Sequence, residues 1–387
     1  MLVGTLFWIK NMMKSLLTAA VAAAFLVACG KKDEPAATVA APAPAGQQVL
    51  NIFNWDDYIP DGMIAAFERE FGIRVNYNTF ESNETLHARL VAGNSGFDIV
   101  VPTVGFSQRQ LNAGLFQPLD KSRIPNLANL DPTFMQKLAS IDEGNRHYVP
   151  WGWGFTTVGI NRQKVEAALG TSELPANSWE LVFNPEYSNR LRGCGIIFLD
   201  SPSEIMPAAL HYLGLPPYSG NPDDLRAAGE MLAQIRPNIR QFSNNMIDDI
   251  VSGLGCAFVG WSGDINIAAG RVSELGSADE IVPLLPSTGG IFFADVMAIP
   301  ADARNVEAAH TFINFFLRPE NAARMANEMN FATGNLAAMP LIKPEIAGNR
   351  TIMVPADYMP RMIQPGSLSN EAREAMATAY NTFRRGN

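Results

Sequence analysis

The chain contains 387 residues, 47% of them hydrophobic and 17% charged, with a formal net charge of −9 at pH 7. The excess of acidic side chains argues against nucleic acid as a partner and suits a cationic ligand. The roughly 340 residues after Gln48 exceed what one core usually holds, so two domains are expected.

The N-terminus has the layout of a bacterial export signal. Two lysines precede an apolar run that ends in Leu26-Val27-Ala28-Cys29, with small residues before the cysteine. The run is shorter than the ~20 apolar residues that a membrane span needs. Because the ending resembles a bacterial lipobox, residues 1–28 are predicted to be a lipoprotein signal peptide. Cys29 would then be the lipidated first residue of the mature chain.

Residues 29–48 are rich in alanine and proline and show no apolar periodicity. Such a composition cannot bury a core, so we expect a flexible, lipid-anchored tether before a globular body that begins near Val49. The protein is then periplasmic and is held to a membrane by its lipid anchor only. It stays open whether translation starts at Met1 or at Met12 or Met13.

Strand and helix patterns alternate at the start of the body. Val49–Phe53 is a short apolar strand, and a helix follows in which apolar residues recur four apart from Met63 to Phe71. Asp61 is expected to cap this helix and Gly72 to end it. Val75 to Tyr77 then alternates with polar neighbours as a second strand.

The next helix has a single apolar face formed by Leu86, Leu90 and Val91, and Gly93 is expected to end it. Phe97–Pro102 follows as a buried strand. The order strand, helix, strand, helix, strand predicts a parallel α/β sheet. In such sheets ligands bind beyond the carboxyl ends of the strands.

An aromatic ring followed closely by a carboxylate occurs in three segments that lie far apart. They are Asn54-Trp55-Asp56-Asp57-Tyr58, Gly260-Trp261-Ser262-Gly263-Asp264 and Phe292-Phe293-Ala294-Asp295. A dry carboxylate is costly unless a counter-charge arrives, and an aromatic face attracts an ammonium group. The pairing is therefore typical of a site for an organic cation, provided that the fold brings the segments together.

Two cysteines remain if Cys29 is lipidated. Cys194 and Cys256 would lie in an oxidising compartment, where a disulfide can form and persist. Both lie next to apolar stretches, 196–198 and 257–259, that look like buried strands. A disulfide is favoured, and two separate buried thiols are the alternative.

Eight segments, in one order along the chain, resemble the polyamine-binding proteins of bacterial ABC transporters, the putrescine and spermidine receptors. They are residues 49–60, 76–90, 97–103, 116–121, 198–204, 260–264, 289–300 and 312–320. The resemblance implies an α/β type II periplasmic-binding fold, with two α/β lobes and a ligand cleft between them. It also implies a disulfide between Cys194 and Cys256.

The lobes expected from this resemblance each combine two parts of the chain. Lobe 1 is expected to contain residues 49–150 and 296–340, and lobe 2 residues 151–295 and 341–387. We further expect a monomer without a cofactor or metal. It would deliver its ligand to an ABC permease, whose ATPase supplies the energy.

The resemblance assigns ligand contacts to aromatic and polar residues at matching positions. Trp55 and Tyr58 match one aromatic wall over the methylene chain, and Trp261 matches the opposite wall. Phe293 is expected to stack beside the ammonium. Ser82 matches a hydroxyl that bonds the amine, although it could equally cap a helix.

The acids at matching positions are expected to pair with the ammonium groups of the ligand. Asp57 lies near one ammonium, Glu204 lies toward one end of the ligand, and Asp264 and Asp295 grip an ammonium between them.

Three departures from the family concern ligand choice. Asp56 stands where many relatives carry a small hydroxyl residue and adds a carboxylate beside Trp55. Ser201 replaces an acid that spermidine receptors use, and Phe331 replaces a frequent tyrosine. Putrescine is favoured, while spermidine, cadaverine and agmatine stay open.

Two other functions must be weighed, a secreted carbohydrate-active enzyme and a polyamine sensor. Carboxylates across a cleft can hydrolyse glycosides. However, the four histidines, His87, His147, His211 and His310, show no metal-ligand spacing and no triad motif. Gly289-Gly290 is expected to serve a turn or a close backbone approach rather than phosphate binding. We therefore expect no enzyme.

Overall fold

The computed structural model describes residues 48–366 and 368–386. The predicted signal peptide, Cys29 and all of the predicted tether before Gln48 lie outside the described residues. No helix in the described part of the chain is long and apolar enough to cross a membrane.

The first sheet is parallel, as the alternation of strands and helices predicts. It contains β1 (Val49–Trp55), β2 (Arg74–Phe80) and β3 (Ile99–Val100) in the order β2-β1-β3. Its connecting helices are α2 (Met63–Phe71) and α3 (Asn83–Val91). The strand β3 is shorter than the predicted Phe97–Pro102 because only its two residues keep register with β1.

The observed ends of α2 and α3 agree with those predicted from the sequence, with one exception. The prediction that Asp61 caps α2 is wrong, because Gly62 occupies the N-cap with φ 72° and makes no side-chain cap bond. Asp61 lies one residue too early. Gly72 ends α2 in the left-handed conformation, as predicted. The Ser82 hydroxyl caps α3 by accepting a hydrogen bond from the backbone N–H of Thr85 at 3.2 Å.

The second sheet is mixed, with strand order β6-β5-β7-β4-β8 and β9 paired to β4. Its strands are β4 (Val149–Asn161), β5 (Ile196–Leu199), β6 (Ile239–Ser243), β7 (Ala257–Trp261), β8 (Ile281–Pro283) and β9 (Ile291–Met297). β5 runs parallel to β6 and β7, whereas β4 runs antiparallel to β7, β8 and β9. The apolar stretches beside the two cysteines are thus neighbouring buried strands.

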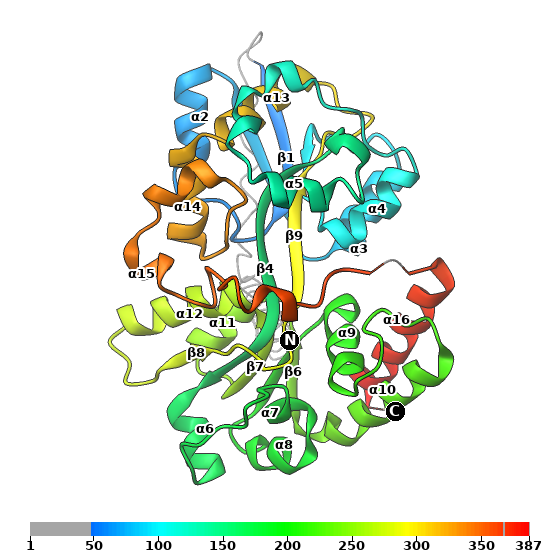
Figure 1. Cartoon of the computed structure of the whole chain (residues 1–387), viewed down its shortest axis with the longest axis vertical. Coiled ribbons are helices and arrows are strands. Elements are labelled where there is room, and N and C mark those ends of the chain that lie inside the picture. Colours follow the sequence, from blue (N-terminus) through cyan, green and yellow to red (C-terminus); the bar gives the residue numbers. More distant parts are fainter. Residues whose placement is uncertain (1–47, 367, 387) are drawn as a thin grey trace, which may run out of the picture. The chain divides into compact units, whose positions relative to one another are not determined.

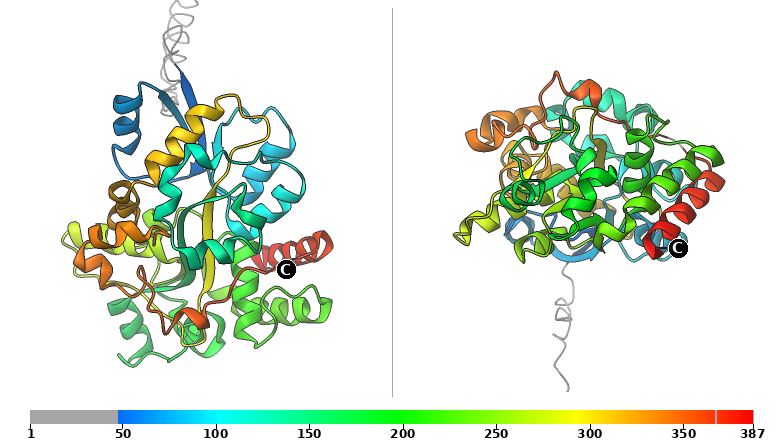
Figure 2. Two further views of the ribbon diagram at one scale, coloured as in Figure 1. Left: turned by 45° about the horizontal axis from the view of Figure 1, so that its top comes forward. Right: turned by 90° about the horizontal axis from the view of Figure 1, so that it is seen from below.

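The antiparallel pair β4 and β9 connects the two sheets. β9 pairs with β4 from Ile291 to Met297, and the same segment forms bridges from Asp295 to Thr103 and from Ala298 to Val100. Figure 1 shows the two strands side by side between two groups of helices. The left view of Figure 2 shows β9, in yellow, again running between these groups of helices. The lobe boundaries expected from the sequence stay a prediction.

Helices cover both sheets. The remaining helices are α4 (Val104–Asn112), α5 (Pro132–Leu138), α6 (Arg162–Leu169), α7 (Glu180–Phe183), α8 (Pro185–Leu191), α9 (Pro202–Tyr212), α10 (Pro222–Ile235), α11 (Met246–Val251), α12 (Ser262–Glu274), α13 (Val306–Phe316), α14 (Pro319–Met329), α15 (Pro344–Ala347) and α16 (Asn370–Arg385). One large core packs α2 and α13 against the first sheet around Phe67 and Phe312. Another packs α9, α10 and α16 against the second sheet around Phe198 and Tyr380.

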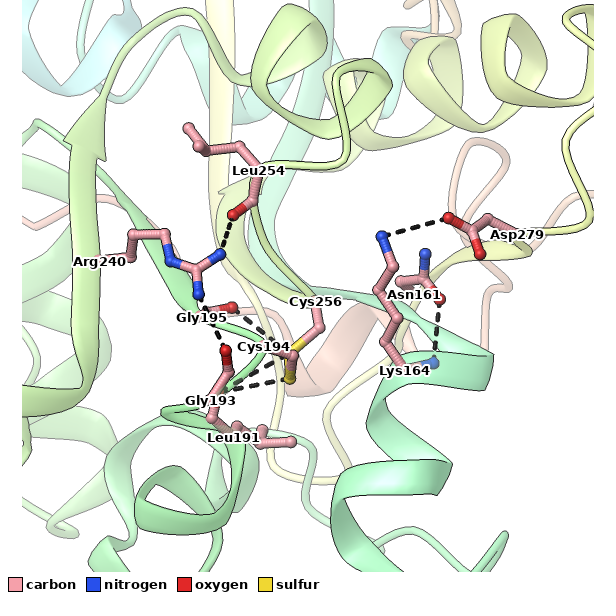
Figure 3. The surroundings of a disulfide bond; sticks show 10 residues. All are labelled: Asn161, Lys164, Leu191, Gly193, Cys194, Gly195, Arg240, Leu254, Cys256 and Asp279. Carbon is pink, nitrogen blue, oxygen red and sulfur yellow. Dashed lines mark hydrogen bonds and ion pairs between the residues drawn. A yellow bond between two sulfur atoms is a disulfide. The ribbon is translucent and has the colours of Figure 1, made fainter.

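Cys194 and Cys256 form the favoured disulfide, with their Cα atoms 5.5 Å apart (Figure 3). The alternative of two separate thiols is therefore wrong. The cysteines meet because each lies just before a strand, and these strands, β5 and β7, are neighbours. The guanidinium of Arg240 donates hydrogen bonds to the carbonyls of Gly193 and Leu254, so it joins the same two loops.

We predict that replacing both cysteines, Cys194→Ala with Cys256→Ala, lowers the free energy of unfolding by about 2–4 kcal/mol. The bond closes a loop between residues 62 apart in sequence, and its loss frees the unfolded chain. Urea unfolding of the variant and of oxidised wild type measures the difference. Reduced wild type is the control and should resemble the variant. Equal stability of all three samples would contradict the prediction.

Candidate ligand-binding site

One cavity of about 480 Å³ is lined by all ten residues that the sequence predicts for ligand binding. They come from both sheets and from the helices that follow their strands. These residues are Trp55, Asp56, Asp57, Tyr58, Ser82, Glu204, Trp261, Asp264, Phe293 and Asp295. The fold thus brings together segments that lie more than 200 residues apart, while their role in binding stays a prediction.

The ends of two strands place the indole walls of the cavity. Trp55 ends β1 and Trp261 ends β7, and their rings lie 5.8 Å apart with an edge-on angle of 70°. The indole N–H of Trp55 donates a hydrogen bond to the carbonyl of Val101 at 2.9 Å, and Phe80 packs on the same ring. These contacts hold the ring of Trp55 in one orientation at the carboxyl end of the first sheet.

Asp295 is the most buried acid in the cavity, with 4% of its surface exposed. Its carboxylate accepts hydrogen bonds from the hydroxyls of Tyr58 at 3.0 Å and Thr103 at 2.7 Å. Burial raises the pKa of Asp295 to about 7, and the two hydrogen bonds oppose that rise. These bonds fix the direction of the carboxylate, and no basic side chain of the described residues lines the cavity around it.

Asp264 and Glu204 also have pKa values that burial raises. Burial, with the nearby charge of Asp57, raises the pKa of Asp264 to about 7. Burial also raises the pKa of Glu204 to about 8, although the hydroxyl of Thr156 donates a hydrogen bond to it at 2.5 Å. The charges of Asp295 and Glu84 raise the pKa of Glu204 further.

No lysine, arginine or histidine lies among the described residues that line this cavity. The carboxyl groups of Asp264, Asp295 and Glu204 therefore share a partly dry space that no described basic side chain lines. Such an arrangement is costly in the empty protein and favourable once a cation enters. Nor do residues 48–366 and 368–386 contain a group of three or more His, Cys, Asp or Glu side chains that could hold a metal ion.

The three positions at which this sequence departs from the usual residues of the polyamine-binding family, Asp56, Ser201 and Phe331, also line the cavity. Asp56 and Asp57 are exposed at its edge, and Asp57 has a positive φ of 47°. Ser201 and Phe331 are part of the wall. The ring of Phe331 packs edge-on against Tyr58 at 4.7 Å, and a Cβ on Gly263 would collide with it. Gly263, in the second aromatic and acid segment, therefore makes room for this ring.

Sequence reasoning missed several residues that support the acids. Thr103 lies three residues after the end of β3, so the rule about strand ends that finds Trp55 could have found it. Thr156 lies in the middle of β4, where no local pattern distinguishes it from a core position.

Across the cavity, the side-chain amide of Asn244 donates a weak hydrogen bond to the carbonyl of Glu81 at 3.5 Å.

The four histidines do not line the cavity. His310 is buried and accepts a hydrogen bond from the backbone N–H of Asp120, while His147 pairs with Asp142. Gly289 has φ 112° and lies so close to the carbonyl of Arg361 that no Cβ would fit. This confirms the expected close backbone approach.

Comparisons with known proteins identify the family of this chain. Residues 62–351 match the family model described as "Bacterial extracellular solute-binding protein". The chain is 40% identical to the putrescine-binding periplasmic protein SpuD of Pseudomonas aeruginosa, covering 88% of this chain and 93% of the relative. It is 42% identical to the putrescine-binding periplasmic protein PotF of Escherichia coli, and the match covers 82% of this chain and 86% of the relative.

A solved structure with the same fold is the putative spermidine/putrescine ABC transporter from Listeria monocytogenes. The TM-score is 0.78 at 30% identity, covering 88% of this chain and all of that one. Together with the two sheets, this likeness confirms the predicted type II periplasmic-binding fold. The chain belongs to the family of bacterial extracellular solute-binding proteins.

Proposed function

We propose that this protein captures a polyamine, with putrescine favoured, and delivers it to an ABC permease. The observation that carries the proposal is a cavity with aromatic walls, one buried and two half-buried carboxyl groups with raised pKa values, and no described basic side chain in its lining. The names of the relatives, which describe putrescine binding, support the choice of ligand.

The chemistry of a diamine fits the groups in the cavity. An ammonium at each end needs charge-assisted hydrogen bonds to replace its hydration shell, and the methylene chain between them needs an apolar cover. In the proposed complex, Asp264 and Asp295 hold one ammonium and Glu204 lies toward the other end. Trp55 and Trp261 cover the methylene chain.

Transport follows from the position of the cavity between the two sheets. A ligand that touches both sides stabilises the closed arrangement by its differential affinity for that state. The closed form would be presented to the permease, and a partner ATPase would supply the energy. We propose a monomeric binding protein without enzymatic activity, located in the periplasm and anchored through a lipid on Cys29.

Calorimetric titration of the purified chain tests this function and names the ligand. We expect tight one-to-one binding of putrescine, weaker binding of cadaverine, spermidine and agmatine, and none of glucose. The neutral sugar is the control for the carbohydrate alternative. No heat with any amine would overturn the proposal.

Asp295→Asn and Asp264→Asn should each weaken putrescine binding by roughly 2–5 kcal/mol. An amide keeps the size of the side chain but cannot balance the charge of a buried ammonium. Asp357→Asn is the matched control, because Asp357 is exposed and lies outside the cavity. Wild-type affinity in both cavity variants, with unchanged melting temperatures, would refute the assignment of the site.

Putrescine affinity should rise with pH between about 6 and 9. Asp264 and Asp295, with pKa about 7, and Glu204, with pKa about 8, must lose protons before they pair with an ammonium. The ligand amines stay charged over this range, since alkylammonium groups titrate near 10.4. Calorimetry in buffers of different ionisation enthalpy should detect proton release on binding at pH 7. A flat pH profile without proton release would contradict this linkage.

A further inference from the structure

A second cavity of about 310 Å³ adjoins the amine cavity. The two share part of their walls, formed by Asn83, Glu84, Thr103, Ser203, Glu204 and Phe293. Beyond this shared wall, the second cavity is lined by two arginines, Arg109 and Arg373. The proposed diamine site does not use either of them.

The two arginines come from helices that pack on different sheets. Arg109 lies in the last turn of α4, whose Val104 packs in the core of the first sheet. Arg373 lies in the first turn of α16, whose Met376 and Tyr380 pack against the second sheet. Both helices lie on the same side of the molecule as α3 and α9 (Figure 1).

Neither guanidinium has a partner within the described residues. Arg109 and Arg373 form no ion pair with any described acid, although Glu84, Glu204 and Glu374 line the same cavity. The Nε–H of Arg373 is buried without a hydrogen-bond acceptor. Buried donors are nearly always satisfied in proteins, so this one calls for an acceptor.

The surrounding charges make the arginines unfavourable neighbours in the empty protein. Burial and the charge of Arg109 lower the pKa of Arg373. Burial and both arginines lower the pKa of His87, whose Nδ1 is also buried without a partner. An anion would relieve the repulsion and supply the missing acceptor.

We propose that Arg109 and Arg373 bind an oxyanion, a carboxylate or phosphate group, in the cavity beside the amine site. Guanidinium groups suit such ligands because their planar N–H forks match paired oxygens. The oxyanion is either a free anion or the acidic end of an extended amine ligand that reaches past Glu84 and Glu204. The extended amine ligand, as the source of the oxyanion, rests on the proposed function.

Oxyanion and amine binding should favour each other. The anion bridges helices that pack on different sheets, and it attracts the cation in the adjoining cavity. By thermodynamic linkage, each ligand then raises the affinity of the other by the same factor.

The first test is calorimetry and phosphorus NMR of the purified full chain with inorganic phosphate and no amine. We expect saturable binding in wild type, at least about tenfold weaker in Arg109→Gln and in Arg373→Gln. Arg350→Gln is the matched control, since Arg350 is exposed and outside both cavities. Arg109 is itself exposed, so its variant should fold even if the Arg373 variant does not.

The second test measures putrescine affinity with and without phosphate at constant ionic strength. For a free anion, phosphate should strengthen putrescine binding about fivefold or more in wild type, and this gain should vanish in both arginine variants. For an extended ligand, the monoamide of putrescine with succinic acid should bind wild type and lose affinity in the same variants.

The outcomes separate this proposal from the proposed function. If neither phosphate nor the succinic monoamide shows binding that depends on the two arginines, the oxyanion site is overturned, even where putrescine binds well. If phosphate binding depends on the arginines but no amine binds, the oxyanion site stands and the polyamine function fails.

Discussion

The cost of burying carboxylates without a counter-charge explains most of the features of this site. Asp264, Asp295 and Glu204 lie in one cavity that the described basic residues do not line. Desolvation raises their pKa values to about 7 or 8, so the empty site holds protons in place of a cation. In the proposed function, a ligand with ammonium groups replaces those protons, which would make the site selective for cations.

The pairing of β4 with β9 makes this arrangement possible. β9 carries Asp295 within the second sheet, while the same residue bridges to Thr103 beyond the end of β3. Tyr58 and Thr103 then direct hydrogen bonds to its carboxylate from the side of the first sheet. One acid is thus held by elements of both sheets, which places it where closure around a ligand would act.

The cavity lined by Arg109 and Arg373 places positive charge next to the amine cavity. Glu84 and Glu204 line the boundary between the two cavities, and Arg109 and Arg373 lie beyond it. Among the described residues, these two arginines form no ion pair with the acids that line the two cavities. Both sets of charges therefore stay available to ligands, since a direct ion pair would satisfy them internally.

The sequence by itself determined the parallel first sheet, the three aromatic and acid segments, two of them at strand ends, and the pair of cysteines, because these depend on local periodicity and on residue type. It placed the cap of α2 on Asp61, one residue too early, since side-chain propensity fixes a helix end only approximately. Tertiary structure alone decided that Thr156, in the middle of β4, supports Glu204 and that Arg109 and Arg373 line one cavity. Each of these arrangements brings together residues far apart in the chain, and no local pattern records which distant side chains will lie close to one another.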